Sequence, residues 1–589
     1  MKITKLILVT ITIFAVIAIH DLPMTFASDK QGVNTSKYSL LSDPFLQLPT
    51  KNTVNVVWFT EFLGSDHVVK YGAEFALKAI ASTTKLTRVR EDEDSHLDSP
   101  PAKSKRDIWR HEATVTGLEP NQRLPYKVES VIEGQVVSSD VFTLAGNPTP
   151  ETALKILLTS DHQLMPMTPA NLSQVEQTIG RVDGVFLPGD LVNIPDRASE
   201  WFDDIRGGAF FPSLQGRANY ELEPEGITTT YHGGQIIQHA PLFPAIGNHE
   251  VMGKVSAQSS LKEEFGQPQP RKVAQEFYQA NIAQINPTND PQVKTDWIKD
   301  NSFNSDTYEE IFSLPQSEAG GKRYYATTFG DIRLISLYVT NIWRSPSLAA
   351  DALGRYKEND QDINNPQAWG YGQHIFEPIA KGSAQYQWLE QELQSEAYQQ
   401  AKYKIVMFHH PPHTLGGNIV PPYTDPQPRL YYADNDQVKS RYYDYPIEND
   451  YIVRDLLPLL ESAGVQLVYY GHSHLWNRFQ SESGMHFLES SNVGNSYGAH
   501  EADNPRPIPT YSPKNFIATG DPNGLTPIVP NIAPLTDDSG QPLAYIASDE
   551  ITVFSVFETA TGTVSSYRFD TREPNSQAVM FDQFELIAN

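Results

Sequence analysis

Five short apolar runs of this chain each lead, within three residues, into side chains that can bind a metal ion. Such runs, bounded by turn residues, are typical of buried strands, and functional groups of α/β proteins gather where these strands end. The sequence therefore predicts that five loops, spread over more than 300 positions, meet at one place. The motifs are Asp161-x-Gln163, Gly189-Asp190, Gly247-Asn248-His249-Glu250, His409 and Gly471-His472-x-His474.

Between these motifs, strand-like runs such as "LKILLTS" and "YKIVMFHH" alternate with helix-like runs such as "NLSQVEQTIGRV". This alternation predicts a layered α/β domain, which we place at residues 153–503. Residues 504–589 are first Pro-rich and then resemble a hairpin, "EITVFSVFETATGTVSSYRF". We expect them to wrap the surface and to return strands to the same domain, with Thr561 and Gly562 in the turn.

Residues 43–146 show only β-type patterns, such as the alternation of "TVNVVWFT", and predict an all-β sandwich domain. Leu118, Pro120 and Tyr126 have the spacing of a sandwich corner, in which the Tyr hydroxyl bonds to an upstream backbone group. Core packing alone would also explain Tyr126. The charged insert Lys85–Lys105 is predicted to be a solvated loop.

The N-terminus has the pattern of a signal peptide at residues 1–27: two early lysines, the apolar run Leu6–Ile19 and the small-x-small site "TFA". An uncleaved membrane anchor is the alternative, but the run is short for a bilayer. Cleavage would leave a flexible leader at residues 28–42 and a periplasmic or extracellular protein. The chain has no Cys, which excludes disulfides, a cysteine nucleophile and a thiolate zinc site.

Acidic residues outnumber basic ones by 71 to 45, which gives a formal net charge of −26. This charge repels phosphate backbones and anionic lipids, so a nucleic-acid polymer or a membrane surface is disfavoured as a partner. The length of 589 residues predicts two or three domains. The sequence does not indicate an oligomeric state.

Two inserts, Lys254–Gly321 and Thr414–Glu448, are longer than ordinary loops, and either could form a lid. The second contains the Tyr- and Arg-rich stretch Arg429–Tyr443. We interpret that stretch as a packed insert. Because aromatic rings also stack on nucleobases, a nucleobase platform is the alternative.

The five motifs together hold the side chains that a pair of divalent metal ions requires. Two ions about 3.5–4 Å apart can activate a water molecule and stabilise both oxygens of an in-line displacement at phosphorus. Such a pair needs one bridging carboxylate and separate oxygen and nitrogen ligands for each ion. His472 and His474 are two residues apart, so in an extended segment their rings point the same way.

The order Asp-x-Gln, Gly-Asp, Gly-Asn-His-Glu, His and Gly-His-x-His resembles the calcineurin-like metallophosphoesterases. The stretches "YYATTFGDIRLISL", "SAQYQWLEQEL" and "IVMFHHPP" are similar to the purple acid phosphatase branch, whose members carry an N-terminal fibronectin-III-like domain. The resemblance implies a catalytic domain in which a layered β-sandwich is flanked by helices. It runs from about Asp43 to Asn492 and more loosely to the end.

The resemblance also implies a role for each motif residue. Asp190 would bridge two divalent ions. Of the other ligands, one ion would take Asp161, Gln163 and His474, and the second Asn248, His409 and His472. His249 would contact the phosphate and either protonate the leaving oxygen or stabilise its developing charge, held in orientation by Glu250, while a metal-bound hydroxide attacks. His413 is a further candidate for contact with substrate.

Two positions depart from the family pattern. Gln163 stands where many relatives have His, and its amide oxygen can still bind a hard cation. Asn193 stands where purple phosphatases have Tyr, so the iron(III) chromophore would be lost. We therefore predict a colourless enzyme with two divalent ions: manganese, zinc or iron(II).

The function implied is that of an exported phosphatase that hydrolyses small-molecule phosphomonoesters. A phosphodiesterase or nucleotide pyrophosphatase that uses the same metal pair is the alternative. A binding or surface protein that has lost activity is a third possibility, against which the intact Asn248, His249, His472 and His474 argue.

Overall fold

The computed structural model describes residues 37–267, 269–344, 354–508 and 516–587. The signal peptide predicted at residues 1–27 and most of the predicted leader lie outside the described residues. The chain divides into two units, residues 1–39 and 40–589, and every described helix and strand lies in the second.

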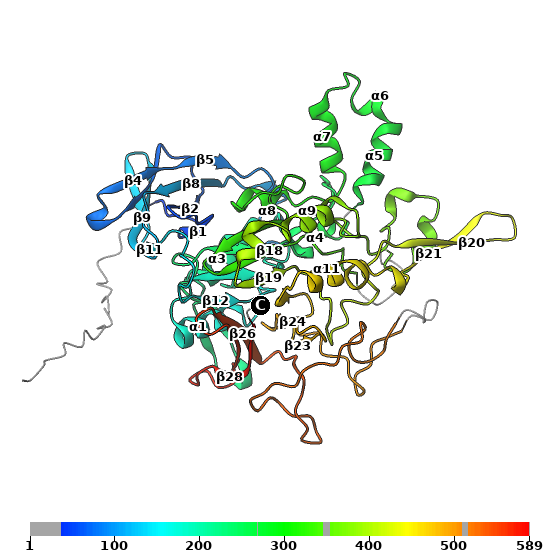
Figure 1. The fold of residues 1–589 in the computed structure, drawn as a ribbon. Coiled ribbons are helices and arrows are strands. Elements are labelled where there is room, and N and C mark those ends of the chain that lie inside the picture. The colour runs from blue at the N-terminus through cyan, green and yellow to red at the C-terminus, as the bar shows by residue number, and fades with distance from the viewer. Residues whose placement is uncertain (1–36, 268, 345–353, 509–515, 588–589) are drawn as a thin grey trace, which may run out of the picture. The chain divides into compact units, whose positions relative to one another are not determined.

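The N-terminal part is a β-sandwich of two antiparallel sheets (Figure 1). The sheets pack face to face, as two contacts between them show. The Trp58 indole N–H donates to Ser130 Oγ at 3.0 Å, and the rings of His67 and His111 stack at 3.6 Å. The first sheet has the order β1-β2-β8-β5, with β1 at Phe45–Gln47, β2 at Thr53–Thr60, β8 at Trp109–Thr116 and β5 at Ser82–Lys85. The second has the order β10-β9-β3-β4, with β11 also on β9; its strands are β10 (Gln135–Ser138), β9 (Leu124–Ile132), β3 (Asp66–Tyr71), β4 (Leu77–Ile80) and β11 (Phe142–Leu144).

The insert predicted to be solvated is instead partly buried. It forms a two-stranded ribbon of β6 (Arg90–Glu91) and β7 (Ser104–Lys105), and Leu86 and Val89 join the hydrophobic core. The prediction was wrong because the charges of the insert are paired across a seam with the α/β part. We call this set the buried ion network; its members are Arg90, Asp92, Lys103, Asp196, Arg197, Glu200 and Glu264.

The hydrogen-bond partner predicted for Tyr126, an upstream backbone group of the sandwich corner, was also wrong. The Tyr126 ring is fully buried, but its hydroxyl donates to the carbonyl of Gln238 at 2.7 Å, far downstream in the α/β part. Burial of the ring left the hydroxyl in need of an acceptor, and the adjoining loop supplies it. Tyr126 therefore fastens the sandwich to the α/β part.

The α/β part contains two mixed sheets, which confirms the predicted layered fold. The first has the order β16-β13-β12-β26-β27-β28, with β16 at Leu242–Pro244, β13 at Gly184–Leu187, β12 at Lys155–Leu158, β26 at Ile551–Glu558, β27 at Thr563–Asp570 and β28 at Val579–Glu585. The second has the order β17-β18-β19-β22-β24-β23-β25, with β17 at Tyr325–Phe329, β18 at Ile332–Ser336, β19 at Tyr403–Met407, β22 at Leu467–Tyr470, β24 at His486–Ser490, β23 at Trp476–Gln480 and β25 at Tyr545–Ile546.

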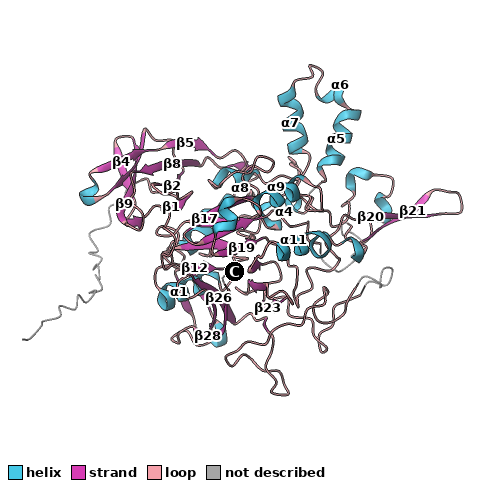
Figure 2. Cartoon of the chain, in the orientation of Figure 1, coloured by secondary structure: helices cyan, strands magenta, loops and turns pink. Residues whose placement is uncertain are grey.

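The two sheets pack against each other through large side chains. The ring of Tyr403 lies 4.9 Å from that of Phe557, and the Trp476 indole N–H donates to Ser566 Oγ at 3.0 Å. Figure 2 shows the strands in the middle of this part and helices on the outside. The helices are α1 (Thr168–Ile179), α2 (Ala198–Phe202), α3 (Phe210–Leu214), α9 (Ala384–Glu392), α10 (Glu396–Gln400) and α11 (Leu457–Ser462).

The predicted C-terminal hairpin is present as β26 and β27, with Thr561 and Gly562 between the strands. Strand β26 pairs antiparallel with β12 in the middle of the first sheet. The last strands of the chain therefore complete the sheet whose strands lead into the first three metal-binding motifs.

The two long inserts fold differently from each other (Figure 1). The first contains α4 (Leu261–Phe265), α5 (Arg271–Ala280), α6 (Ile282–Ile285), α7 (Pro291–Asp300) and α8 (Asp306–Ile311). The second projects as a hairpin of β20 (Gln427–Tyr432) and β21 (Val438–Asp444). A smaller hairpin pairs β14 (Tyr220–Leu222) with β15 (Thr229–Tyr231).

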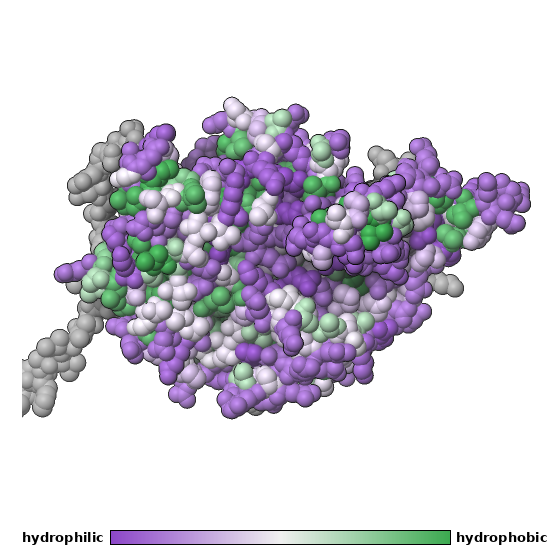
Figure 3. Space-filling model, turned by 90° about the horizontal axis from the view of Figure 1, so that it is seen from above, coloured by the Kyte–Doolittle hydropathy of each residue, from purple (hydrophilic) through white to green (hydrophobic). Residues whose placement is uncertain are grey.

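Hydrophilic residues cover most of the face seen in Figure 3, and hydrophobic residues form small groups between them. Within the described ranges, no helix is both long enough and apolar enough to cross a bilayer.

Candidate metal centre

All five polar motifs lie at the carboxyl ends of parallel strands. Three follow β12, β13 and β16, which pair in parallel in the first sheet. The other two follow β19 and β22, a parallel pair of the second sheet. The two sheets pack face to face, so the loops that follow these strands can meet at the seam between the sheets. His409 of the second sheet contacts Asp190 of the first.

Two glycines make the close approach of these loops possible. A Cβ at Gly247 would overlap the Asp190 carboxylate, and a Cβ at Gly471 would overlap that of Asp161. Several motif residues also have left-handed backbone angles, among them Asp190 (φ 56°) and His472 (φ 82°). Non-glycine residues in this region cost about 1 kcal/mol or more each and persist at functional sites, where the surroundings over-determine them.

The first group of ligand atoms surrounds His409. Its Nε2 lies 3.1 Å from Asp190 Oδ2, 3.1 Å from Asn248 Oδ1 and 3.1 Å from His472 Nδ1. The other ring nitrogen, Nδ1, donates to the Pro188 carbonyl at 3.0 Å, which fixes the ring. Asp190, His409 and His472 are all buried and form one candidate metal site.

The second group shares Asp190 with the first. Asp161, Asp190 and His474 form another candidate site, in which His474 Nε2 lies 3.4 Å from Asp161 Oδ1. Gln163 reaches Asp190 Oδ2 through its Nε2 at 3.1 Å. The His474 ring is held by its Nδ1–H, which donates to the Asn495 carbonyl at 3.0 Å.

The electrostatics of the centre favour positive charge. Burial opposes ionisation of Asp190, yet the adjoining His409 and His249 hold the pKa of its carboxyl below the usual range. Burial would lower the pKa of His409, but the Asp190 carboxylate raises it to about 9. Asp161 similarly raises the pKa of His474 against the effect of burial.

The arrangement of donors and acceptors fits bound cations. One N–H of His409 cannot satisfy the three acceptor atoms that lie around it. Adjacent ligands of an ion bound octahedrally at about 2.1 Å are about 3 Å apart, close to the separations found here. Within the described chain, Gln163 Oε1 and His472 Nε2 are also buried without a hydrogen-bond partner.

The contacts of His249 and Glu250 differ in one respect from the expected pairing. The backbone N–H of His249 donates to Asp190 Oδ1 at 2.9 Å, and its Nδ1–H donates to the Asn193 carbonyl at 2.7 Å. Glu250 does not orient this ring. Its carboxylate accepts the backbone N–H groups of Asp190, Leu191 and Gly247 at 2.7–2.8 Å, so it clamps two loops together.

Asn193 stands at the position where the purple phosphatases that the sequence resembles have Tyr. Besides holding His249 through its carbonyl, it donates from Nδ2 to the Gln163 carbonyl at 2.6 Å. It therefore links two motif loops. The two departures from the family pattern, Gln163 and Asn193, are direct neighbours in the fold.

The structure does not bring His413 to the centre. Its Nδ1 lies 2.7 Å from Asp521 Oδ2, and its ring packs on Phe487 at 4.6 Å. The residue is buried, and its described contacts are with Asp521 and Phe487 rather than with a metal ligand, so they do not support a role in binding substrate.

Three residues that hold the centre were not found from the sequence. Glu489 accepts the Ser473 backbone N–H at 2.7 Å, and Asn418 donates to the His472 carbonyl at 2.6 Å. Asn495 lies in the stretch "VGNSYG", where two glycines flank a polar loop, and this is the one signal that could have been used. Glu489 sits inside a strand and has no such signal.

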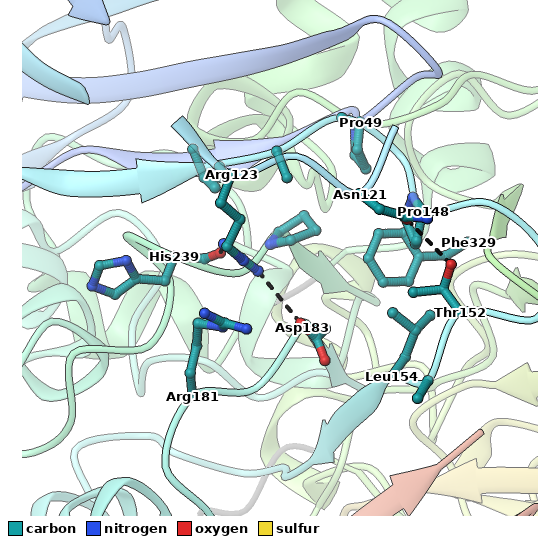
Figure 4. A pocket seen from close by; sticks show the side chains of 15 residues that line it. Pro49, Asn121, Arg123, Pro148, Thr152, Leu154, Arg181, Asp183, His239 and Phe329 are labelled. Carbon is teal, nitrogen blue, oxygen red and sulfur yellow. Dashed lines mark hydrogen bonds and ion pairs between the residues drawn. The ribbon is translucent and has the colours of Figure 1, made fainter. Parts of the chain in front are cut away.

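A cavity of about 190 Å³ lies elsewhere, at the seam between the sandwich and the α/β part (Figure 4). Arg123, Arg181, Asp183 and His239 lie along one side of it, and Arg123 pairs with Asp183 at 3.4 Å. Leu154 and Asp183 precede β12 and β13, whereas the metal-binding motifs follow these strands. The cavity therefore lies at the amino-terminal ends of these strands, and the metal centre lies at their carboxyl ends.

Comparisons with known proteins agree with this geometry. The model of the family described as calcineurin-like phosphoesterase matches residues 154–475. The structure of purple acid phosphatase PPD1 from yellow lupin (Lupinus luteus) seeds matches with a TM-score of 0.50 and 14% identity, over 93% of this chain and 74% of that one. At this identity the likeness concerns the fold alone.

Two other results complete the comparisons. Astrotactin-2, described as a vertebrate-specific and perforin-like membrane protein, matches with a TM-score of 0.13 and 13% identity, over 23% of this chain and 26% of that one. A likeness this slight carries no argument. No curated protein matches the sequence.

Proposed function

Because the chain belongs to the calcineurin-like phosphoesterase family of metal-dependent phosphoric ester hydrolases, we propose that it hydrolyses small-molecule phosphomonoesters at the centre around Asp190. The observation that carries the proposal is that two buried ligand groups share this one carboxylate. The fold shared with a purple acid phosphatase supports monoesters as the substrate class.

The ligand sets follow the two groups. Asp161, Gln163 and His474 would hold one ion, Asn248, His409 and His472 the other, with Asp190 common to both. Bound divalent ions supply an activated water and neutralise charge on the phosphoryl oxygens. Manganese, zinc or iron(II) suits this set of carboxylate, amide and imidazole donors, and the lack of a phenolate at Asn193 leaves the protein colourless.

His249 is the proposed general acid. Its Nδ1–H is committed to the Asn193 carbonyl, so only Nε2 remains to face the substrate. As the ester P–O bond breaks, the oxygen of water becomes bonded to phosphorus and the leaving oxygen takes a proton from this ring. Glu250 is a positioning residue, because it holds the loop of His249 against that of Asp190.

The test compares 4-nitrophenyl phosphate with bis(4-nitrophenyl) phosphate on the metal-loaded full chain. We expect faster turnover of the monoester. On an alkyl phosphate monoester, whose leaving alkoxide needs a proton, His249→Ala should lower kcat by roughly 10²- to 10⁴-fold with bound metal unchanged, as for loss of a general acid.

Three results would contradict the proposal. Faster turnover of the diester would favour the phosphodiesterase alternative. Full metal content with no turnover of either ester would favour a binding protein. Undiminished activity of His249→Ala would exclude the assigned acid.

A further inference from the structure

Aromatic rings extend outward from one imidazole of the metal centre. The Tyr497 ring stacks on His474 with centroids 4.8 Å apart and planes 23° apart. The Trp343 ring stacks in turn on Tyr497, at 5.8 Å and again 23°. Both separations lie in the range preferred by offset-stacked rings. We call Tyr497 and Trp343 the aromatic wall.

The wall is only partly covered. Tyr497 is 44% exposed and Trp343 is half-buried, whereas the large aromatic side chains of the core are almost completely buried. A further ring, that of the half-buried Phe265, stacks on His249 with centroids 4.9 Å apart. The proposed acid and one proposed ligand therefore each carry a partly solvent-exposed ring.

A purely structural role explains the wall poorly. A ring against His474 could serve to orient that ligand, but the bond from His474 Nδ1 to the Asn495 carbonyl already does so. Trp343 stacks on Tyr497, one ring away from the ligand. A second large ring left partly in water at the site has a clear use if it binds part of a substrate.

We propose that the aromatic wall binds a flat aromatic or heteroaromatic leaving group of the phosphate ester. The inference rests on the proposed function, because it places the phosphate at the metal centre beside His474. Flat rings of different chemistry stack on exposed Tyr and Trp, since each offers a π-face. The wall would therefore select aryl, benzyl or nucleoside esters over aliphatic ones.

The aromatic wall, and not the Arg429–Tyr443 stretch, is the aromatic surface beside the metal centre. The Tyr- and Arg-rich stretch considered for that role forms the projecting β20–β21 hairpin (Figure 1). Within this hairpin the rings of Tyr431 and Tyr442 lie 5.1 Å apart. The described contacts of that pair do not include a ring of the metal centre. Trp343 and Tyr497 reach the centre through their stack on His474.

The test uses two phosphonates that the enzyme cannot hydrolyse. Benzylphosphonate and cyclohexylmethylphosphonate carry the same charged group and similar bulk, but only the first has a flat π-ring. Their Kd values are measured by calorimetry on the manganese-loaded full chain, and hydrolysis of the two corresponding phosphate esters is measured in parallel.

We expect the wild type to bind benzylphosphonate about tenfold more tightly than its saturated analogue. Trp343→Leu keeps an apolar side chain but removes the ring, so this ratio should fall to within about twofold of one, with the Kd of the saturated probe little changed. Tyr497→Phe keeps the ring and should keep the ratio. Tyr431→Leu, at a tyrosine of similar exposure (45%), is the matched control and should leave both Kd values unchanged.

A ratio near one in the wild type, an unchanged ratio in Trp343→Leu, or failure to bind either phosphonate would overturn the inference. Failure of the proposed function gives a different result: the phosphonates bind with the expected ratio, but neither ester is hydrolysed. Equal losses for both probes in Trp343→Leu would show that the ring only supports the loop, and this too would overturn it.

Discussion

The metal centre and the buried ion network are both buried clusters of charged side chains, and they use neighbouring carboxylates of the stretch "GDLVNIPD". In the network, Asp196 meets Arg90 at 2.6 Å, and Asp92 meets Arg197 at 3.0 Å. In the centre, the described contacts of the Asp190 carboxylate are the Gln163 amide, the His409 imidazole and the His249 backbone N–H, with no Lys or Arg among them.

The difference separates a structural cluster from a functional one. A buried carboxylate paired with guanidinium from the same chain needs nothing further, and removing its partner leaves an uncompensated charge. A buried carboxylate whose partners are imidazole and amide groups, with no Lys or Arg side chain, favours binding of a cation from outside. The comparison leads to three predictions, given from the largest expected effect to the smallest.

The largest effect comes from exchanging each carboxylate for its amide. Asp190→Asn removes the shared ligand, so metal content should fall below one ion per chain and kcat/KM by at least roughly 10³-fold. Asp196→Asn is the matched control. It should retain metal content and kcat/KM within about twofold while lowering stability. Metal analysis and turnover check both, and the comparison fails if Asp190→Asn keeps its metal or Asp196→Asn loses it.

Arg90→Met should give the next largest effect, on stability alone. Its guanidinium also lies 2.8 Å from Glu264, whose side chain is fully buried, so the free energy of unfolding should fall by about 3–5 kcal/mol. Lys85→Met in the same insert removes an exposed pair with Asp107 and should cost less than about 1 kcal/mol. Denaturant unfolding followed by circular dichroism measures both. Equal losses of unfolding free energy in the two variants would mean that the buried ion network stabilises the protein no more than an exposed ion pair does.

The smallest effect is the loss of stability on chelation. Ions at a hundredfold excess over their Kd stabilise the folded state by about 2.7 kcal/mol. For a chain of this size, removing them should lower Tm by about 2 °C. The shift should be present in Asp196→Asn and absent in Asp190→Asn. A chelator that shifts Tm equally in all three proteins would place the stabilising ion elsewhere.

Patterns confined to one segment were predictable from the sequence. The alternation of strands and helices indicated the α/β part, and the ends of apolar runs indicated which loops would hold Asp161, Asp190 and Asn248. The hairpin of β26 and β27 was equally visible, because its turn and its alternation lie in one short stretch.

Partners from distant segments were not predictable. The acceptor for Tyr126, the burial of the charged insert and the clamp made by Glu250 each depend on a residue from another loop or another part of the chain. His413 lies four residues after the ligand His409, yet its described contacts are with Asp521 and Phe487 rather than with a metal ligand. Glu489 resembles any other strand residue until the loop of Ser473 is placed above it.

The sequence by itself determined the kind of chemistry, because metal-binding side chains after buried strands carry their own local signal. Only the tertiary structure decided what holds the His249 ring, what Glu250 contacts and which aromatic side chains lie beside the ligands. Those properties depend on atoms brought within a few ångströms from loops far apart in the chain, and their energies fall steeply with distance.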